Sequence, residues 1–423
     1  MLIGAVADDI TGATDLCLML TRSGLHTVQV IGLPDPDVPL PKADAVVIAL
    51  KSRTIPADQA AALSVAAGRR LLSAGAQQVM FKYCSTFDST DAGNIGPVIE
   101  ALLALTSCPI TIACPAFPAN GRTVYEGHLF VGHQLLSDSP MKDHPLTPMR
   151  DANLVRVLSR QTQLPVGLLN LATVAKGVAA VRAVLATEAA KGARILIADC
   201  VSEADLLTLG AACRDLPLVT GGSGIALGLA ANFPANPARR MQVSRMAAPA
   251  GRAVILAGSC SVATLGQIEM ARAAGLPFFA LDIKAIAEGR QTAAQIAEWA
   301  IVQPSDLPPV ICSSADPRSL ARVQQLLGRE ASGALVESVL ADIAQRLRIA
   351  GFSRFVIAGG ETSGAVVAAL GVTMLDIGPE IDPGVPWTRS IGGPDLALAL
   401  KSGNFGAPDF FVKAWSQLES EAA

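Results

Sequence analysis

Glycine and hydroxyl residues recur at three places between residues 258 and 406, each time directly after an apolar run. These segments are GGETSG at 359–364, GSCS at 258–261 and KSGNFG at 401–406. Paired glycines such as Gly359 and Gly360 let a backbone approach a ligand closely, and free N–H groups at the start of a helix attract anions. The three segments together predict a phosphate-binding edge, although GGETSG alone would equally suit a tight turn with a Ser or Thr cap.

Two adjacent carboxylates, Asp8 and Asp9, come directly after the first apolar run of the chain. Carboxylates at a strand end can bind substrate hydroxyls, hold a metal ion or accept a proton during phosphoryl transfer. One of them could instead cap the following helix and favour its dipole. The sequence leaves open which of the two takes a proton, and it does not identify metal ligands.

A polar segment, KYCSTFDSTDAGN at 82–94, follows a second apolar run. Its hydroxyls, one lysine and one aspartate are typical of a site that binds a polyol, and Lys82 is an unusual residue for an apolar strand. We expect Lys82 to pair with a carboxylate, as could Arg122 in a later loop, because charge-assisted hydrogen bonds favour such pairs. The residues predicted to bind substrate are Lys82, Ser85, Asp88, Ser89 and Arg122.

The elements that would position these residues alternate between short β-branched runs and Ala- and Leu-rich helical stretches. Such alternation predicts an α/β fold of doubly wound, mostly parallel sheets. The chain has 423 residues, which is long for one core. The segment 232–251 is rich in Pro, Ala and Arg and lacks periodicity, so we expect domains at 1–235 and 252–423 with a ligand cleft between them.

Composition excludes several classes of function. The formal net charge is −3 and 16% of residues are charged, without a long basic run. Nucleic-acid and anionic-membrane partners are therefore not expected. No signal peptide or spanning segment is predicted, so we expect a cytoplasmic protein. The eight cysteines show no zinc spacing, and neither a P-loop nor a dinucleotide fingerprint is present.

Several separated motifs together resemble the four-carbon acid sugar kinase family. They are ADDITGATD at 7–15, GGSG at 221–224, GGETSG at 359–364 and the run 377–406 from IGPEID to SGNFG. The resemblance covers nearly the whole chain. It implies an N-terminal domain that binds a sugar acid and a C-terminal domain that binds ATP with Mg²⁺. It also implies nucleotide contacts from Ser259, Gly360, Glu361, Thr362, Ser363 and Gly403.

Within that family, the segment 81–98 lacks the Leu-Arg pair usual in members that act on erythronate or threonate. It is more similar to the branch that acts on 3-oxo-tetronate. The resemblance implies transfer of the ATP γ-phosphoryl group to a C4 hydroxyl, with Asp8 or Asp9 as base or hydroxyl anchor. A D-threonate or D-erythronate kinase, a non-catalytic sugar-acid sensor and an oxidoreductase stay open as alternatives. The sequence is silent on oligomeric state, and a homo-oligomer stays open.

Overall fold

The computed structural model describes residues 1–144, 147–234, 246–313 and 328–418. The chain divides into two compact units, Met1–Arg240 and Met241–Ala423. The segment 235–245, which contains most of the expected linker, lies outside the described residues.

The first unit is built on a parallel sheet whose described strands run in the order β2-β3-β1-β4-β11-β5-β10-β9. Apart from the half-buried edge strand β9, each strand is a short, mostly buried apolar run, as expected for a sheet covered on both faces. Their bounds are β1 Ile3–Ala7, β2 Thr27–Ile31, β3 Ala45–Ala49, β4 Gln78–Lys82, β5 Thr111–Cys114, β9 Val166–Leu169, β10 Ile195–Ala198 and β11 Leu218–Gly221.

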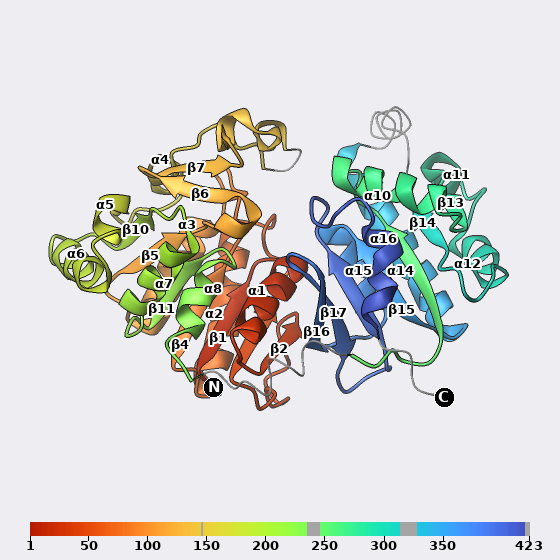
Figure 1. Ribbon diagram of the computed structural model, residues 1–423, viewed down its shortest axis with the longest axis horizontal. Helices are drawn as coiled ribbons and strands as arrows, with labels where there is room; N and C mark the ends of the chain where they lie inside the picture. Colours follow the sequence, from red (N-terminus) through yellow and green to blue (C-terminus); the bar gives the residue numbers. More distant parts are fainter. Residues whose placement is uncertain (145–146, 235–245, 314–327, 419–423) are drawn as a thin grey trace. The chain divides into compact units, whose positions relative to one another are not determined.

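Helices of the first unit pack in two groups on the two faces of this sheet, with α1, α8, α7 and α6 in one group and α2, α3 and α4 in the other (Figure 1). Ser202 and Asp205 form a reciprocal capping box at the start of α7. The helices are α1 Ile10–Arg22, α2 Ala57–Ser73, α3 Ile95–Thr106, α4 Leu154–Ser159, α5 Leu171–Val174, α6 Val178–Ala190, α7 Glu203–Ala212 and α8 Ile225–Ala230.

The segment 114–149 interrupts the alternation of strands and helices. It contains a small antiparallel sheet in the order β6-β7-β8. Two tight turns with glycines at positive φ, Gly127 and Gly132, join its strands. The bounds are β6 Arg122–Tyr125, β7 His128–Val131 and β8 Gln134–Leu135, and short 3₁₀ turns at Pro118–Asn120, Leu136–Asp138 and Pro140–Asp143 flank them.

The second unit repeats the plan with strands in the order β13-β14-β12-β15-β18-β17-β16. The pairs from β13 to β18 are parallel, whereas β17 pairs antiparallel with both β18 and β16. The bounds are β12 Arg252–Ala257, β13 Phe278–Ala280, β14 Val310–Cys312, β15 Phe352–Ala358, β16 Met374–Asp382, β17 Val385–Ser390 and β18 Ala397–Lys401.

Helices also lie on both faces of this second sheet (Figure 1). Contacts join α14 with α15, α12 and α11, and separately join α10 with α16. On the α10 side, Trp387 is fully buried and donates from Nε1 to the Ala414 carbonyl at 2.8 Å. The helices are α10 Val262–Ala273, α11 Ile283–Ala287, α12 Ala293–Ile301, α14 Arg329–Ile349, α15 Gly360–Ala369 and α16 Phe410–Lys413, followed by the 3₁₀ turn Ala414–Gln417.

The predicted fold class, α/β with mostly parallel sheets and helices on both faces, is confirmed. Among the described residues, every helix is too short or too polar to cross a membrane.

Candidate active site

Asp8 and Asp9 follow β1, at the topological switch point of the first sheet. The chain fills β1, β2 and β3 on one side of β1 and then crosses to β4 on the other side. Ala7 is level with both Ala49 of β3 and Lys82 of β4, so the carboxyl ends of the three strands meet at one edge. Such switch points are the usual ligand crevices of open α/β sheets.

Arg53, in the loop after β3, joins the two carboxylates at this edge. Its Nε donates to Asp8 Oδ2 and its Nη2 to Asp8 Oδ1, both at 2.8 Å. The same Nη2 lies 2.5 Å from Asp9 Oδ1, and Nη1 lies 3.9 Å from Asp88 Oδ2. One guanidinium therefore organises three carboxylates.

Asp9 takes the capping role that one of the two carboxylates was expected to have. Its Oδ2 accepts from the hydroxyl of Thr11 at 2.7 Å and from the backbone N–H of Gly12 at 3.1 Å, at the start of α1. Burial alone would raise the pKa of Asp9, but Arg53, Lys82 and these hydrogen bonds together lower it to about 2. Asp9 is thus a stable anion and a weak base.

Asp8 differs from Asp9 in its ionisation. Burial raises the pKa of Asp8 above its ordinary value, against the opposing attraction of Arg53. Its side chain is only 5% exposed. A carboxylate with a raised pKa is a better proton acceptor than its neighbour, which distinguishes the two residues that the sequence could not separate.

Lys82, the last residue of β4, is almost completely buried beside the start of α1. A Cβ atom placed on Gly12 would lie 2.8 Å from Lys82 Nζ and 2.2 Å from Asp9 Oδ1. Only glycine at position 12 leaves room for the ammonium and the carboxylate at this helix start. The structure therefore places Lys82 next to the acidic pair.

The loop after β4 brings further predicted residues to the same edge. Thr86 donates to Asp88 Oδ1 at 2.6 Å, and Cys84 Sγ lies 3.0 Å from the Thr86 hydroxyl. Ser89 is held from behind, since Gln161 Nε2 donates to its hydroxyl at 2.8 Å. The Ser85 backbone packs against GGSG, with its Cα 3.5 Å from a Cβ built on Gly222.

The contacts recorded for Arg122 do not join it to this cluster. It begins β6, and its Nη1 donates to the carbonyl of Asn120 within the same turn. Arg53 was missed by the sequence interpretation. Its signal was available, because it follows a strand next to β1, and the carboxyl ends of adjacent parallel strands share an edge.

The three glycine and hydroxyl segments of the second unit meet at the corresponding edge of its sheet. Strand β12 leads to β13 and β14 on one side, and β15 lies on the other side, so β12 and β15 flank a second switch point. Ala358 is level with both Ala257 of β12 and Lys401 of β18. GSCS, GGETSG and KSGNFG therefore start side by side.

Backbone hydrogen bonds and close packing hold the three segments together. Ser259 N donates to the Ala358 carbonyl at 3.1 Å, and Gly359 N donates to the Lys401 carbonyl at 2.8 Å. A Cβ on Gly258 would lie 2.0 Å from Thr362 Oγ1, and one on Gly403 would lie 2.5 Å from Ser259 Oγ. These glycines allow backbone and hydroxyl groups to approach one another closely.

Helix α15 begins directly after β15. It runs from Gly360, because Gly359 has φ 125° and turns the chain immediately after the strand. The first helical turn thus contains Glu361, Thr362 and Ser363. The Ser363 hydroxyl is buried and has no hydrogen-bond partner within the described residues. This arrangement is typical of an anion site at a helix start.

Lys401 is a second residue that the sequence interpretation missed as part of a site. It is fully buried, and its Nζ donates to Thr264 Oγ1 and to the carbonyls of Ser402 and Gly403 at 3.0–3.1 Å. Burial lowers the pKa of Lys401 to about 7. The amine thus ties KSGNFG to α10.

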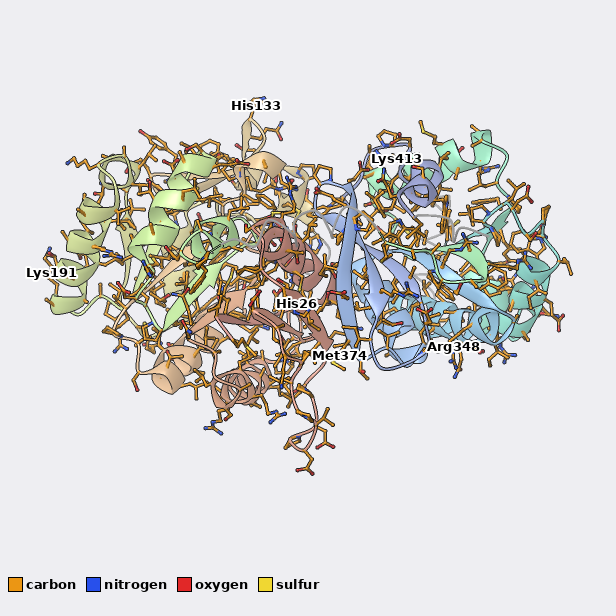
Figure 2. The ribbon with its side chains drawn as sticks, turned by 60° about the horizontal axis from the view of Figure 1, so that its bottom comes forward. His26, His133, Lys191, Arg348, Met374 and Lys413 are labelled. Atoms are coloured by element: carbon orange, nitrogen blue, oxygen red, sulfur yellow. The ribbon has the colours of Figure 1, made fainter. Side chains whose placement is uncertain are left out.

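The end of KSGNFG is also fixed. Asp382 accepts from the Ala407 backbone N–H at 2.7 Å, and Lys413 of α16 (labelled in Figure 2) lies 2.6 Å from the other Asp382 oxygen. In the part of the chain that the structure describes, no group of three or more His, Cys, Asp or Glu residues could hold a metal ion.

Both halves of the chain match family models. Residues 3–229 match the model of a sugar-binding N-terminal domain, and residues 254–411 match that of a nucleotide-binding C-terminal domain. Proteins called 3-oxo-tetronate kinase from Pseudomonas fluorescens and Burkholderia multivorans are each 55% identical to the chain. The alignments cover 99% and 100% of the chain and 97% and 98% of these relatives.

The chain belongs to the four-carbon acid sugar kinase family. The predictions of this family and of an ATP-dependent kinase are confirmed. A crystal structure from Salmonella typhimurium LT2, described as that of a tRNA synthase candidate, is 43% identical to this family member. It has a TM-score of 0.86, and the match covers 99% of both chains.

Proposed function

We propose that this kinase phosphorylates the C4 hydroxyl of 3-oxo-tetronate, with the nucleotide held by the second unit and the sugar acid by the first. The observation that carries the proposal is the convergence of three glycine and hydroxyl segments at the β12/β15 switch point, beside the buried Ser363 hydroxyl. The substrate follows the names of the curated relatives, which share half or more of their residues with this chain.

At the nucleotide site, the backbone around Gly359 and Gly360 and the hydroxyls of Ser259, Thr362 and Ser363 would bind phosphate oxygens. Gly403 would keep the third segment close enough to join them. These backbone and hydroxyl groups carry no net charge. They would therefore orient the phosphates without binding ADP too tightly for its release.

Mg²⁺ would enter with ATP. Mg²⁺ commonly takes most of its oxygen ligands from phosphates and water and only one or two from carboxylates. A site without a cluster of three metal-ligating residues, as in the described part of the chain, is therefore compatible with Mg²⁺ bound to ATP. Glu361, the carboxylate within GGETSG, is our proposed protein ligand, directly or through water. Such an ion neutralises phosphate charge.

At the sugar-acid site, Asp8 would accept the proton of the attacking hydroxyl. The new bond joins the substrate oxygen to the γ-phosphorus, the bond from that phosphorus to the bridging oxygen breaks, and ADP leaves. Asp9 would help to orient the hydroxyl, while Lys82 would attract the substrate carboxylate. The loop that contains Ser85, Asp88 and Ser89 would bind the remaining oxygen atoms of the substrate. Arg122 would contact the substrate only if the substrate reached the turn at Asn120 that holds its guanidinium.

A coupled assay of ADP release tests the function. The panel contains D-threonate, D-erythronate and their 3-oxo forms, and we expect the highest kcat/KM with a 3-oxo acid. A higher value with D-threonate or D-erythronate would contradict the substrate assignment. No ADP release with any of them would contradict the sugar-acid kinase itself and favour a sensor.

A tRNA partner, which the description of the Salmonella structure suggests, has no support in the charge of the chain. Binding of a polyanion needs a concentrated positive surface, whereas the formal net charge here is −3.

A further inference from the structure

We propose that Arg53 is a positioning residue of the sugar-acid site. Its guanidinium holds the Asp8 carboxylate ionised and oriented to take the proton of the substrate hydroxyl, and Asn94 holds the loop of Arg53 in place. This inference rests on the proposed function, because it assigns Asp8 the role of base.

The two hydrogen bonds from Arg53 to Asp8, which we call the fork, fix the carboxylate and still leave it able to accept further hydrogen bonds. Two parallel hydrogen bonds of 2.8 Å lock the rotation of the Asp8 carboxylate. An ionised carboxylate has about four lone-pair positions, and the fork takes one on each oxygen. Among the described residues only Arg53 donates to these two oxygens, which leaves a lone-pair position on each for a substrate hydroxyl.

The loop that carries Arg53 is held by a residue outside the cluster. Asn94 is 5% exposed, and its Nδ2 lies 2.6 Å from the Ser52 carbonyl, 3.0 Å from that of Arg53 and 3.5 Å from that of Ile55. The backbone N–H groups of Ser52 and Arg53 in turn donate to the Asp8 carbonyl. The loop and the strand end thus form one rigid corner.

The charges that face Asp8 make Arg53 decisive for its ionisation. Asp9 is adjacent in the chain, Arg53 comes from the loop after β3, and Lys82 comes from the end of β4. Beyond them lie Asp88, 3.9 Å from Arg53, and the Cys84 thiol, which interacts with Arg53. Without the charge of Arg53, Asp8 would lose the strongest attraction that lowers its pKa, and the weaker attraction of Lys82 would still oppose the repulsion from Asp9. The pKa of Asp8 would then rise further.

The test is the pH dependence of kcat/KM for Arg53→Gln and Arg53→Lys with the best substrate of the panel. A base must be ionised to accept a proton, so a higher pKa of Asp8 moves the acid limb of the profile to higher pH. We expect a move of about one pH unit or more in Arg53→Gln. Arg53→Lys keeps the charge but not the fork, so we expect a smaller move and a fall in kcat of about 100-fold. KM for ATP should stay unchanged in both.

Arg156 offers a matched control in the same unit. It forms the same kind of fork with Asp151, with Nε and Nη2 at 2.6 and 2.5 Å from the two carboxylate oxygens, but its side chain is 56% exposed. Arg156→Gln should leave the acid limb and kcat as in the wild type. Circular dichroism and thermal melting identify variants that have lost their structure.

Asn94→Ala tests the same idea without touching the charged groups. We expect kcat to fall about tenfold, with the acid limb displaced in the same direction as in Arg53→Gln. A uniform loss of kcat/KM at every pH in folded Arg53 and Asn94 variants would overturn the role of Arg53, because a merely structural residue would act in that way. A wild-type protein that phosphorylates no four-carbon acid would contradict the proposed function instead.

Discussion

The two switch points of this molecule have the same topology and opposite chemistry. At the β1/β4 edge the site consists of charged side chains, with Arg53 and Lys82 acting on Asp8 and Asp9. At the β12/β15 edge, backbone groups and hydroxyls meet through glycines such as Gly258. The same sheet geometry can thus present either a charged site or a polar, uncharged site, depending on the residues at the strand ends.

This difference matches what each site is proposed to bind. ATP carries a high negative charge of its own, which backbone N–H groups at a helix start accept without fixed counter-charges. A small sugar acid offers a hydroxyl that must lose a proton, and a carboxylate supplies that base. We therefore expect the first site to be sensitive to charge and pH and the second to be sensitive to shape.

Removing the base should break the comparison most severely. Asp8→Asn is isosteric but cannot accept the proton, so we expect kcat to fall by about 10³-fold. Calorimetry should show unchanged ATP binding, because the second unit is untouched. Asp9→Asn should lose less, since an Asn at this helix start still accepts hydrogen bonds. Turnover of Asp8→Asn close to that of the wild type would exclude Asp8 as the base.

Among the effects on activity, a change of shape at the nucleotide site should be the next largest. In Gly258→Ala the new Cβ would lie 2.0 Å from Thr362 Oγ1 and 3.1 Å from Thr362 Cβ, so the first turn of α15 must move. We expect KM for ATP to rise about tenfold, equivalent to about 1.4 kcal/mol of binding free energy. The acid limb of the pH profile should stay in place.

Gly266 provides the control for that variant. It lies within α10 of the same unit, and a Cβ there would meet no atom within 4 Å. Gly266→Ala should leave ATP binding unchanged and stabilise the helix by up to about 1 kcal/mol. Equal effects of the two alanines on KM for ATP would show that close packing at Gly258 is unimportant.

The sequence predicted much of this comparison, and its failures have physical causes. The alternation of strands and helices determined the fold class, and GGETSG, GSCS and KSGNFG were identified because glycines and hydroxyls after apolar runs are visible locally. Arg53 and Lys401 were missed because their roles depend on which strands are neighbours. Arg122 was selected by residue type alone, and its guanidinium donates to the carbonyl of Asn120 in its own turn.

Lys401 is a buried ionisable group beside the nucleotide site, and it gives the second unit a pH dependence of its own. Its pKa is lowered from 10.5 to about 7 in the folded chain, so between these values the unfolded chain binds more protons. Stability must therefore rise with pH across that range, by up to about 4 kcal/mol. In Lys401→Met this rise should disappear.

Urea unfolding at pH 7 and pH 9.5 measures this rise in stability, and tryptophan fluorescence reports on the second unit alone. The three tryptophans, Trp299, Trp387 and Trp415, all lie in the second unit. If the wild type and Lys401→Met gain the same stability with pH, the Lys401 amine stays charged in the folded state.

The smaller of the two pH effects on stability concerns the first unit at acid pH, where Asp9 provides the counterpart to Lys401. The folded-state pKa of Asp9 is about 2, below its ordinary value of 3.8, so its ionised form stabilises the fold at higher pH. That contribution, about 2 kcal/mol, is present above pH 4 and lost as the pH falls towards 2. Asp9→Asn should remove this contribution, while Asp37→Asn, at an exposed residue, should not.

Because every tryptophan lies in the second unit, the acid transition of the first unit should appear in far-ultraviolet circular dichroism before tryptophan fluorescence changes. Coincident transitions in wild type and Asp9→Asn would show that the Arg53 cluster does not hold Asp9 ionised.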